Sequence, residues 1–452
     1  MTDKLDKFIF SLIVLFSPVF ASAAKPFPSG PAQAEHIAFQ IAVYYTPVPA
    51  SDPVAALRSI VRRDWPALAV ADESITVATG MQVVARMEMD VKANYKAPDA
   101  KSLSYFGRGL SQAQVDAVQG SQQALKLDFS HPRKYTLSGL RAAYGVAEQV
   151  ARATGGLLWD EETRELFTPD KWHELRLANW TGQVPDISAS ITIHAYNNGD
   201  FARAISLGMA KFGLPDIVVA QYPWSSNYAI GTLINLLSQS LAEGVAVGPG
   251  GNVDLDLRTI ANPELRERTT AKLLAKAQLV AKIALVSGTW ESGDPDNRLA
   301  EITFSRYPGP DMPARQDAML ASLFGHEETV KSIKHDDELM AASELARKKL
   351  IGMQAEFLRG LQPGEYIQVK APFQRAAGGN EWMWVEISAW KDGILEGLLK
   401  NEPQDVPSLH GGQVVQVRLD QVFDYYRHHP DGTIEGNTTG ALIEKRSKES
   451  AR

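Results

Sequence analysis

The chain contains no cysteine among its 452 residues. A protein without cysteine forms no disulfide, and it offers no thiol nucleophile, no thiolate ligand for a metal and no cysteine for lipid attachment. A chain of this length does not need disulfides, because it can bury two or three hydrophobic cores. We therefore expect several domains that are stabilised by ordinary apolar packing.

The sequence also lacks an excess of positive charge and a recognisable catalytic motif. Its net charge of −7 argues against a nucleic-acid groove, which needs a basic surface that neutralises phosphates. It has no GxSxG elbow, P-loop, HExxH helix or dinucleotide fingerprint. The carboxylates of "NVDLDLR" and "DPDNRLAE" lack the glycine and the terminal glutamate of a calcium loop. We predict no cofactor and no metal site.

The first 23 residues have the pattern of a secretory signal. Lys4 and Lys7 precede an apolar run over residues 8–20, and "ASA" at residues 21–23 supplies a small-x-small cleavage site. The run is shorter than the roughly 20 residues that span a bilayer. We predict a signal peptide over residues 1–23 and a periplasmic or secreted protein. In the alternative interpretation the signal stays uncleaved, and the protein meets the membrane only through it.

The middle of the chain mixes strand and helix patterns. Residues 24–35, with three prolines and a glycine, predict a linker, and residues 36–260 alternate strands and helices without a regular βαβ period. This favours an α+β fold. The patterns include a helix ended by Gly155 and three strands over residues 187–223, followed by a helix. Apolar residues that recur every three or four positions predict one helix over 262–287 and another over Asp336–Arg359. Residues 261–360 therefore form a predicted helical connector.

The remaining residues, 361–445, predict a small antiparallel β-rich domain. Its central strand alternates two faces, with Met383, Val385, Ile387 and Ala389 on an apolar face. The other face holds three tryptophans with polar residues among them: Trp382, Trp384, Glu386, Ser388 and Trp390. This second face is either packed under a helix or open as a ligand-binding surface for a sugar or an extended peptide. Trp382, Trp384 and Trp390 are the candidate ligand-binding residues.

The hairpin that follows this strand turns at Asp392 and Gly393. A two-residue turn would place the charge of Glu396 opposite Ala389 on the apolar face. A three-residue loop that includes residue 391 avoids this, because it pairs Val385 with Leu399 and Ala389 with Leu395. We predict the three-residue loop.

Several motifs of this domain resemble the YegJ-like family, a group of bacterial domains of unknown function. They are "VKAPF" (369–373), "EWMWVEI" (381–387), Gly397 with "NEP" (401–403), "GGQVVQV" (411–417), "FDYY" and "DGTIEGNTTG". We expect "QVFDYY" to form a short aromatic helix. The resemblance covers about the last 90 residues and implies a domain type without an assigned activity.

One other group of residues has acid–base potential. His194, Lys211 and Asp216 fall within one predicted sheet region, and a buried group of this kind can transfer protons. Strands and turns also carry such residues for structural reasons, so convergence in a pocket is the observation that would separate the two interpretations.

Two functions remain open at the level of sequence. The first is an exported, non-catalytic binding or interaction protein whose partner is an envelope protein or a glycan. The second is a periplasmic enzyme that acts on envelope material with His194, Lys211 and Asp216 at its site. The missing catalytic motifs favour the first.

Overall fold

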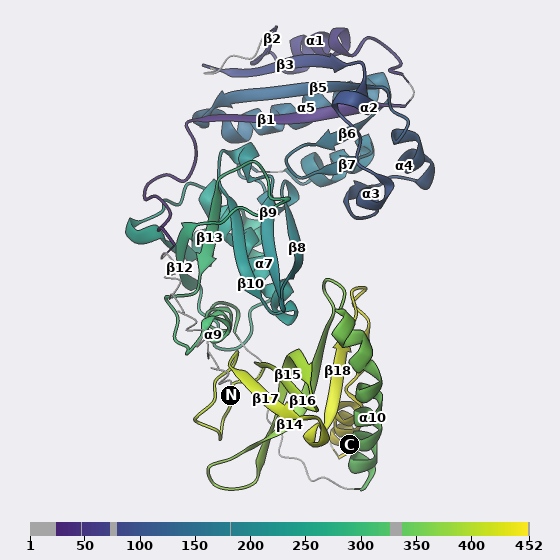
Figure 1. Ribbon diagram of the computed structural model, residues 1–452. Coiled ribbons are helices and arrows are strands. Elements are labelled where there is room, and N and C mark those ends of the chain that lie inside the picture. The colour runs from purple at the N-terminus through teal and green to yellow at the C-terminus, as the bar shows by residue number, and fades with distance from the viewer. Residues whose placement is uncertain (1–23, 47, 73–78, 181, 326–336, 451–452) are drawn as a thin grey trace, which may run out of the picture.

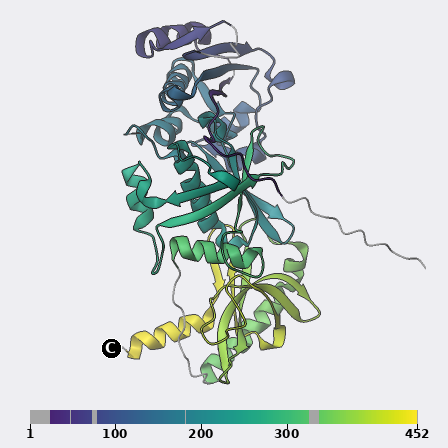
Figure 2. The same ribbon diagram turned by 90° about the vertical axis from the view of Figure 1, so that its left-hand side faces the viewer.

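The computed structural model describes residues 24–46, 48–72, 79–180, 182–325 and 337–450. Three β-sheets follow one another along the chain and along the long axis of the molecule (Figure 1), and the view turned by 90° shows the same succession (Figure 2). Helices lie beside each sheet, so the predicted α+β fold is confirmed. The predicted signal peptide lies outside the described residues. Within them, no helix is long and apolar enough to cross a membrane.

The first sheet has seven strands in the order β2-β3-β5-β1-β6-β7-β4. Ile41, Val43 and Tyr45 of β1 point to the face that α5 covers, whereas Ala42 and Tyr44 point to the face of α2, α3 and α4. The strands are β1 (His36–Tyr45), β2 (Leu68–Ala71), β3 (Met81–Glu88), β4 (Gly107–Arg108), β5 (Gln123–Pro132), β6 (Gly156–Asp160) and β7 (Glu165–Phe167). The helices are α1 (Pro53–Asp64), α2 (Val91–Asn94), α3 (Ala100–Phe106), α4 (Gln112–Val118), α5 (Thr136–Thr154) and α6 (Pro169–Trp172).

The second sheet has six strands in the order β11-β12-β13-β10-β9-β8. Its strands are β8 (Thr192–Asn198), β9 (Phe201–Leu207), β10 (Asp216–Tyr222), β11 (Asn252–Asp256), β12 (Val280–Ser287) and β13 (Leu299–Thr303). Its helices are α7 (Asn227–Ala242), α8 (Pro263–Thr270) and α9 (Met312–Phe324). The strands and the helix predicted over residues 187–244 are present as β8, β9, β10 and α7.

The single helix predicted over residues 262–287 is wrong. Only α8 is helical there, and Val280–Ser287 forms β12 between β11 and β13. The apolar residues of this segment recur at helical spacing, but Ala281, Ile283 and Leu285 also alternate, and these three are buried. Pairing with two neighbouring strands decided between the two periods.

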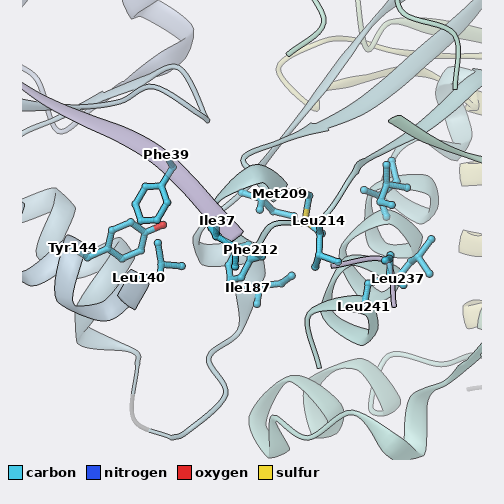
Figure 3. Packing of buried hydrophobic residues seen from close by; sticks show 14 of the residues in the cluster. Ile37, Phe39, Leu140, Tyr144, Ile187, Met209, Phe212, Leu214, Leu237 and Leu241 are labelled. Atoms are coloured by element: carbon cyan, nitrogen blue, oxygen red, sulfur yellow. The ribbon is translucent and has the colours of Figure 1, made fainter. Parts of the chain in front are cut away.

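The first two sheets share one hydrophobic core. Ile37 and Phe39 at the start of β1 meet Met209 and Phe212 of a short 3-10 helix, with α5 on one side and α7 on the other (Figure 3). Gly213 follows this short helix with φ of 68°, and a Cβ atom there would lie 2.6 Å from Cγ1 of Ile37. The close approach of β1 to the second sheet therefore requires glycine at this position.

Residues 24–35, predicted as a linker, pack along the second sheet. The amide of Ser287 donates to the carbonyl of Lys25, and Phe27 is buried with its amide bonded to the carbonyl of Leu285. Gly30 forms an isolated bridge with Val247. Proline is tolerated in a segment at the edge of a sheet, because it lacks the N–H group that a central strand would need for hydrogen bonding.

The third sheet is antiparallel throughout, with the order β17-β16-β15-β14-β18-β19. Helix α10 (Asp337–Arg359) covers one face and forms a second core with it, and α11 (Thr438–Ser450) contacts α10. The strands are β14 (Tyr366–Gln374), β15 (Asn380–Lys391), β16 (Ile394–Leu399), β17 (Val414–Arg418), β18 (Asp424–His428) and β19 (Ile434–Gly436). The antiparallel sheet and the helix predicted before it are confirmed. The short aromatic helix predicted for "QVFDYY" is wrong, because its last three residues begin β18 and pair with β14.

Candidate functional site

A cleft of about 1510 Å³ lies where the second sheet meets the third. One wall comes from α7, α8, α9 and the loop before α9, which belong to the first core. The opposite wall comes from residues 400–413, the loop between β16 and β17 of the third sheet. The cleft thus has walls from two separate cores.

Strand β15 holds the 400–413 loop in place through polar contacts. Asn401 accepts a hydrogen bond from the backbone amide of Trp384 at 2.6 Å. The buried carboxylate of Glu381 accepts from the amides of Gln404 and Asp405, each at 2.9 Å. A buried carboxylate is stable in such a setting because both oxygens are hydrogen-bonded. The "EWMW" and "NEP" motifs therefore act together in shaping this wall.

Three contacts dock the third sheet on the second. A Cβ atom at Gly412 would lie 2.6 Å from the carbonyl oxygen of Pro313, so the loop touches the start of α9 backbone to backbone. The carboxylate of Glu386 accepts from the hydroxyl of Ser225 and from its amide at 3.3 Å. Asn197 of β8 donates to the carbonyl of Leu361 at 3.3 Å. These contacts join the third sheet to the second, and Ser225 also lines the cleft.

The lining of the cleft combines hydrogen-bonding and apolar side chains. Hydroxyl and amide groups come from both walls, from Ser225, Thr232 and Asn235 on one and Asn401, Gln404 and Gln413 on the other. Apolar surface comes from Leu236, Leu265, Leu273, Leu320 and Phe324. Aromatic lining is limited to Tyr228 and Phe324 in the described part of the chain. Mixed lining of this kind suits a ligand with both polar and apolar groups.

Lys272 and Tyr228 at the rim of the cleft are joined by a hydrogen bond and a cation–π contact. The Lys272 ammonium donates to the Tyr228 hydroxyl at 3.1 Å and lies 5.8 Å from the centre of its ring. Tyr228 is 71% exposed. The neighbouring Arg268 is already neutralised, because it pairs with Asp186 at 2.5 Å. Within the described residues, Lys272 has no such carboxylate partner.

The three candidate tryptophans do not share one face. Trp390 is 3% exposed, belongs to the core under α10, and packs against Phe357 with ring centres 5.9 Å apart. Its predicted place beside Trp382 and Trp384 is therefore wrong. The reason is a β-bulge between Ile387 and Ala389, which reverses the alternation of β15 at that point.

The same bulge corrects the predicted hairpin register. The turn has two residues, Asp392 and Gly393, with φ of 50° and 75°, as a type I′ turn requires. Ala389 pairs with Glu396 and not with Leu395. Beyond the bulge the strands return to the predicted pairing of Val385 with Leu399. Ala389 is exposed, so Glu396 opposite it costs little.

Trp382 and Trp384 are half-buried and lie outside the core that β15 forms with α10. Trp382 packs on Phe423 with ring centres 4.8 Å apart, and it lines a hollow of about 350 Å³ together with Arg347. Trp384 packs against Tyr426, and the ammonium of Lys370 lies 5.8 Å from the centre of its ring. Burial lowers the pKa of Lys370, and the nearby charge of Asp424 opposes this shift. None of the three tryptophans lines the large cleft.

The acid–base candidates are placed apart from the cleft. His194 is half-buried on β8 with its ring 4.7 Å from that of Phe106, and burial followed by the charge of Arg164 lowers its pKa. Lys211 is fully buried and donates to Asp160 at 2.5 Å. Asp216 is buried too, and accepts hydrogen bonds from Ser206, Asn297 and the amide of Met209. Lys211 and Asp216 are near each other, but neither they nor His194 line the cleft.

Lys211 belongs instead to a buried ion-pair network between the first two sheets. Asp160 pairs with both Lys211 and Arg176, and Arg176 pairs with Glu165 at 2.8 Å. Burial alone would raise the pKa of Asp160, but the charges of Lys211 and Arg176 outweigh it and hold that pKa below its usual range. The network satisfies its own charges, which is the arrangement of a structural contact.

Comparison with known proteins assigns one part of the chain. Residues 336–452 match the family described as "Uncharacterized protein conserved in bacteria (DUF2314)". The C-terminal part of this protein is a DUF2314 domain. The match takes in α10 together with the third sheet, and it confirms the bacterial domain of unknown function expected from the C-terminal motifs. No curated protein and no solved structure matches the chain.

The sequence did not reveal the cleft. Its walls come from residues 225–236, 265–276, 308–325 and 400–413, which no local pattern connects. The "NEP" and "GGQ" motifs of the DUF2314 domain were visible, but the α9 surface that they meet lies about 90 residues earlier and follows from the tertiary fold.

Proposed function

We propose that this protein is an exported binding protein of the cell envelope whose ligand occupies the cleft between α7, α8, α9 and the DUF2314 domain. The cleft itself is the observation that carries the proposal. It is large, both of its walls offer hydrogen-bonding groups, and its lining also includes apolar residues. Such concave, mixed surfaces at the junction of two structural units are where ligand sites concentrate.

The arrangement of the acid–base candidates favours binding over catalysis. Lys211 and Asp216 are closed off from solvent and engaged with protein partners, so a substrate would not reach them without opening the first core. This supports a structural role over an acid–base role for Lys211 and Asp216.

The binding role can be tested by blocking the cleft. Ala321 of α9 and Thr232 of α7 both line it and are half-buried, so Ala321→Trp and Thr232→Trp each place an indole in its space. The matched control is Ala355→Trp on the exposed side of α10. We expect the purified protein to retain specific material from an envelope extract, and both blocking variants to lose it while the control keeps it. Protein and carbohydrate analysis of the bound fraction is the measurement.

Retention by both blocking variants, with circular dichroism showing that they are folded, would contradict the proposed site. Two blocking positions on different helices guard against the case in which one substitution prevents folding.

Export is tested separately. The signal pattern over residues 1–23 supports it, and N-terminal sequencing of the protein from the periplasmic or secreted fraction should give Ala24 as the first residue. An intact Met1 in that fraction would speak against cleavage.

A further inference from the structure

We infer that the cleft takes an extended peptide segment of another protein and that the Lys272–Tyr228 pair binds a carboxylate of that segment. The inference rests on the proposed function and names the chemistry of its ligand. Three observations carry it: the size of the cleft, the kind of side chains in its walls, and the charge at its rim.

The size indicates a polymer. A volume of about 1510 Å³ exceeds the usual range of roughly 300–1,000 Å³ for sites that hold one small molecule. The lining also includes Leu236 and Leu265 beside the second sheet as well as Gly411 in the DUF2314 domain. A segment of several residues fills a space of this volume, whereas a compact metabolite leaves most of it filled with water.

The side chains of the walls suit a peptide backbone better than a sugar chain. A peptide presents one donor and one acceptor per residue, and side-chain amides and hydroxyls can meet both. Thr232 and Asn235 of α7 line one wall, Gln404 and Gln413 line the other, and the lining also includes apolar side chains such as Leu320. A sugar chain favours several flat aromatic surfaces, and in the described part of the chain the cleft offers the rings of Tyr228 and Phe324, whereas the half-buried tryptophans lie outside it.

The charge at the rim selects an acidic group. Arg268 of the lining is paired with Asp186, whereas Lys272 contacts the hydroxyl and ring of Tyr228 and has no carboxylate partner among the described residues, although the whole chain carries a net charge of −7. Lys272 and Tyr228 each have a donor that a carboxylate can use at the same time. Charge-assisted bonds of this kind are short and roughly twice as strong as neutral ones.

The test is a selection from a library of random ten-residue peptides displayed on phage, with the purified full-length protein as bait. We expect enrichment of peptides that carry an acidic residue among apolar ones. The selected peptides should bind Lys272→Gln about tenfold more weakly, as the loss of one charge-assisted contact implies. They should bind Lys349→Gln, a control on the exposed side of α10, as well as the unchanged protein.

The outcomes separate the carboxylate assignment, the peptide inference and the proposed function. Enriched peptides without acidic residues, or equal binding by Lys272→Gln, would overturn the carboxylate assignment. A library that yields nothing, while envelope capture still depends on Ala321, would show that the occupant is a glycan or another polymer and would overturn the peptide inference alone. Capture that persists in both cleft-blocking variants would instead remove the proposed function.

Discussion

The side-chain nitrogen of Lys211 lies 2.5 Å from a carboxylate oxygen of Asp160, and neither side chain is exposed to solvent. The contact joins the short helix Met209–Phe212, which lies between β9 and β10 of the second sheet, to β6 of the first sheet. It therefore bears on the stability of the shared core.

Replacing Lys211 by methionine keeps much of the side-chain volume and removes the charge. Asp160 would then be buried with Arg176 as its one remaining cationic partner among the described residues. Breaking a buried pair in this way costs about 3–5 kcal/mol. We expect Lys211→Met to lose that much stability in urea unfolding followed by circular dichroism, and Lys101→Met, an exposed control on α3, to lose almost none. Equal stability of the two variants would show that the network contributes nothing.

The contribution of Glu162 and Asp216 to stability should fall as the pH rises from about 5 to about 7. Burial, and then the charge of Asp160, raises the pKa of Glu162 to about 7, and burial raises that of Asp216 to about 6. Both carboxyl groups bind a proton more tightly in the folded chain than in the unfolded one. Folding therefore takes up protons between the unfolded and folded pKa values, and this contribution is complete at low pH and lost above about pH 7.

Glu162→Gln should flatten part of this slope, because an amide does not titrate. The measurement is a series of urea midpoints from pH 5 to about 8 for the unchanged protein, Glu162→Gln and the exposed control Glu344→Gln. A slope that Glu162→Gln leaves unchanged would show that Glu162 titrates as it does in the unfolded chain.

The tryptophans of β15 should differ in their effect on stability. Trp390→Ala removes an indole from the core under α10 and should cost about 3–5 kcal/mol, as large aromatic truncations do. Trp384→Ala removes a half-buried ring and should cost clearly less. Urea unfolding followed by far-ultraviolet circular dichroism compares the two variants. The reverse order of the two costs would contradict the bulge.

Gly213→Ala tests how closely β1 approaches the second sheet. The variant must adopt a positive φ, at about 1–2 kcal/mol, and must also push Ile37 away, at about 1–3 kcal/mol more. Gly199→Ala is the matched control, since its φ is 63° and open space surrounds the new methyl group. The difference between the two thermal melts isolates the packing term. If the two variants melt alike, Ile37 gives way without cost.

Local patterns predicted much of the fold. Apolar spacing with a glycine stop gave α5, and the acidic start and glycine end gave α10. Helical spacing failed at β12, where Leu273, Ala277, Val280 and Ala284 fit a helix and Ala281, Ile283 and Leu285 fit a strand. Contacts with β11 and β13, distant from any local signal, decided this case.

The candidate site was harder to predict than the fold. Alternation assigned Trp382 and Trp384 to one face correctly, but the bulge moved Trp390 to the other, and bulges have no reliable sequence signature. Gly397 fits this arrangement, since a Cβ atom there would lie 2.0 Å from the carbonyl oxygen of Glu386. The cleft needs α7, α8, α9 and the 400–413 loop together, so it exists only once both units are folded and docked.

The two walls of the cleft belong to different cores, and this has a mechanical consequence. A ligand that touches both walls binds only while the DUF2314 domain is docked on the preceding part of the chain. Its binding energy therefore stabilises the docked arrangement. At a ligand concentration one hundred times the dissociation constant, the docked form would gain about 2.7 kcal/mol. With ligand bound, the DUF2314 domain and the rest of the protein would unfold in one cooperative transition. Without ligand, the two parts would separate and unfold in two transitions.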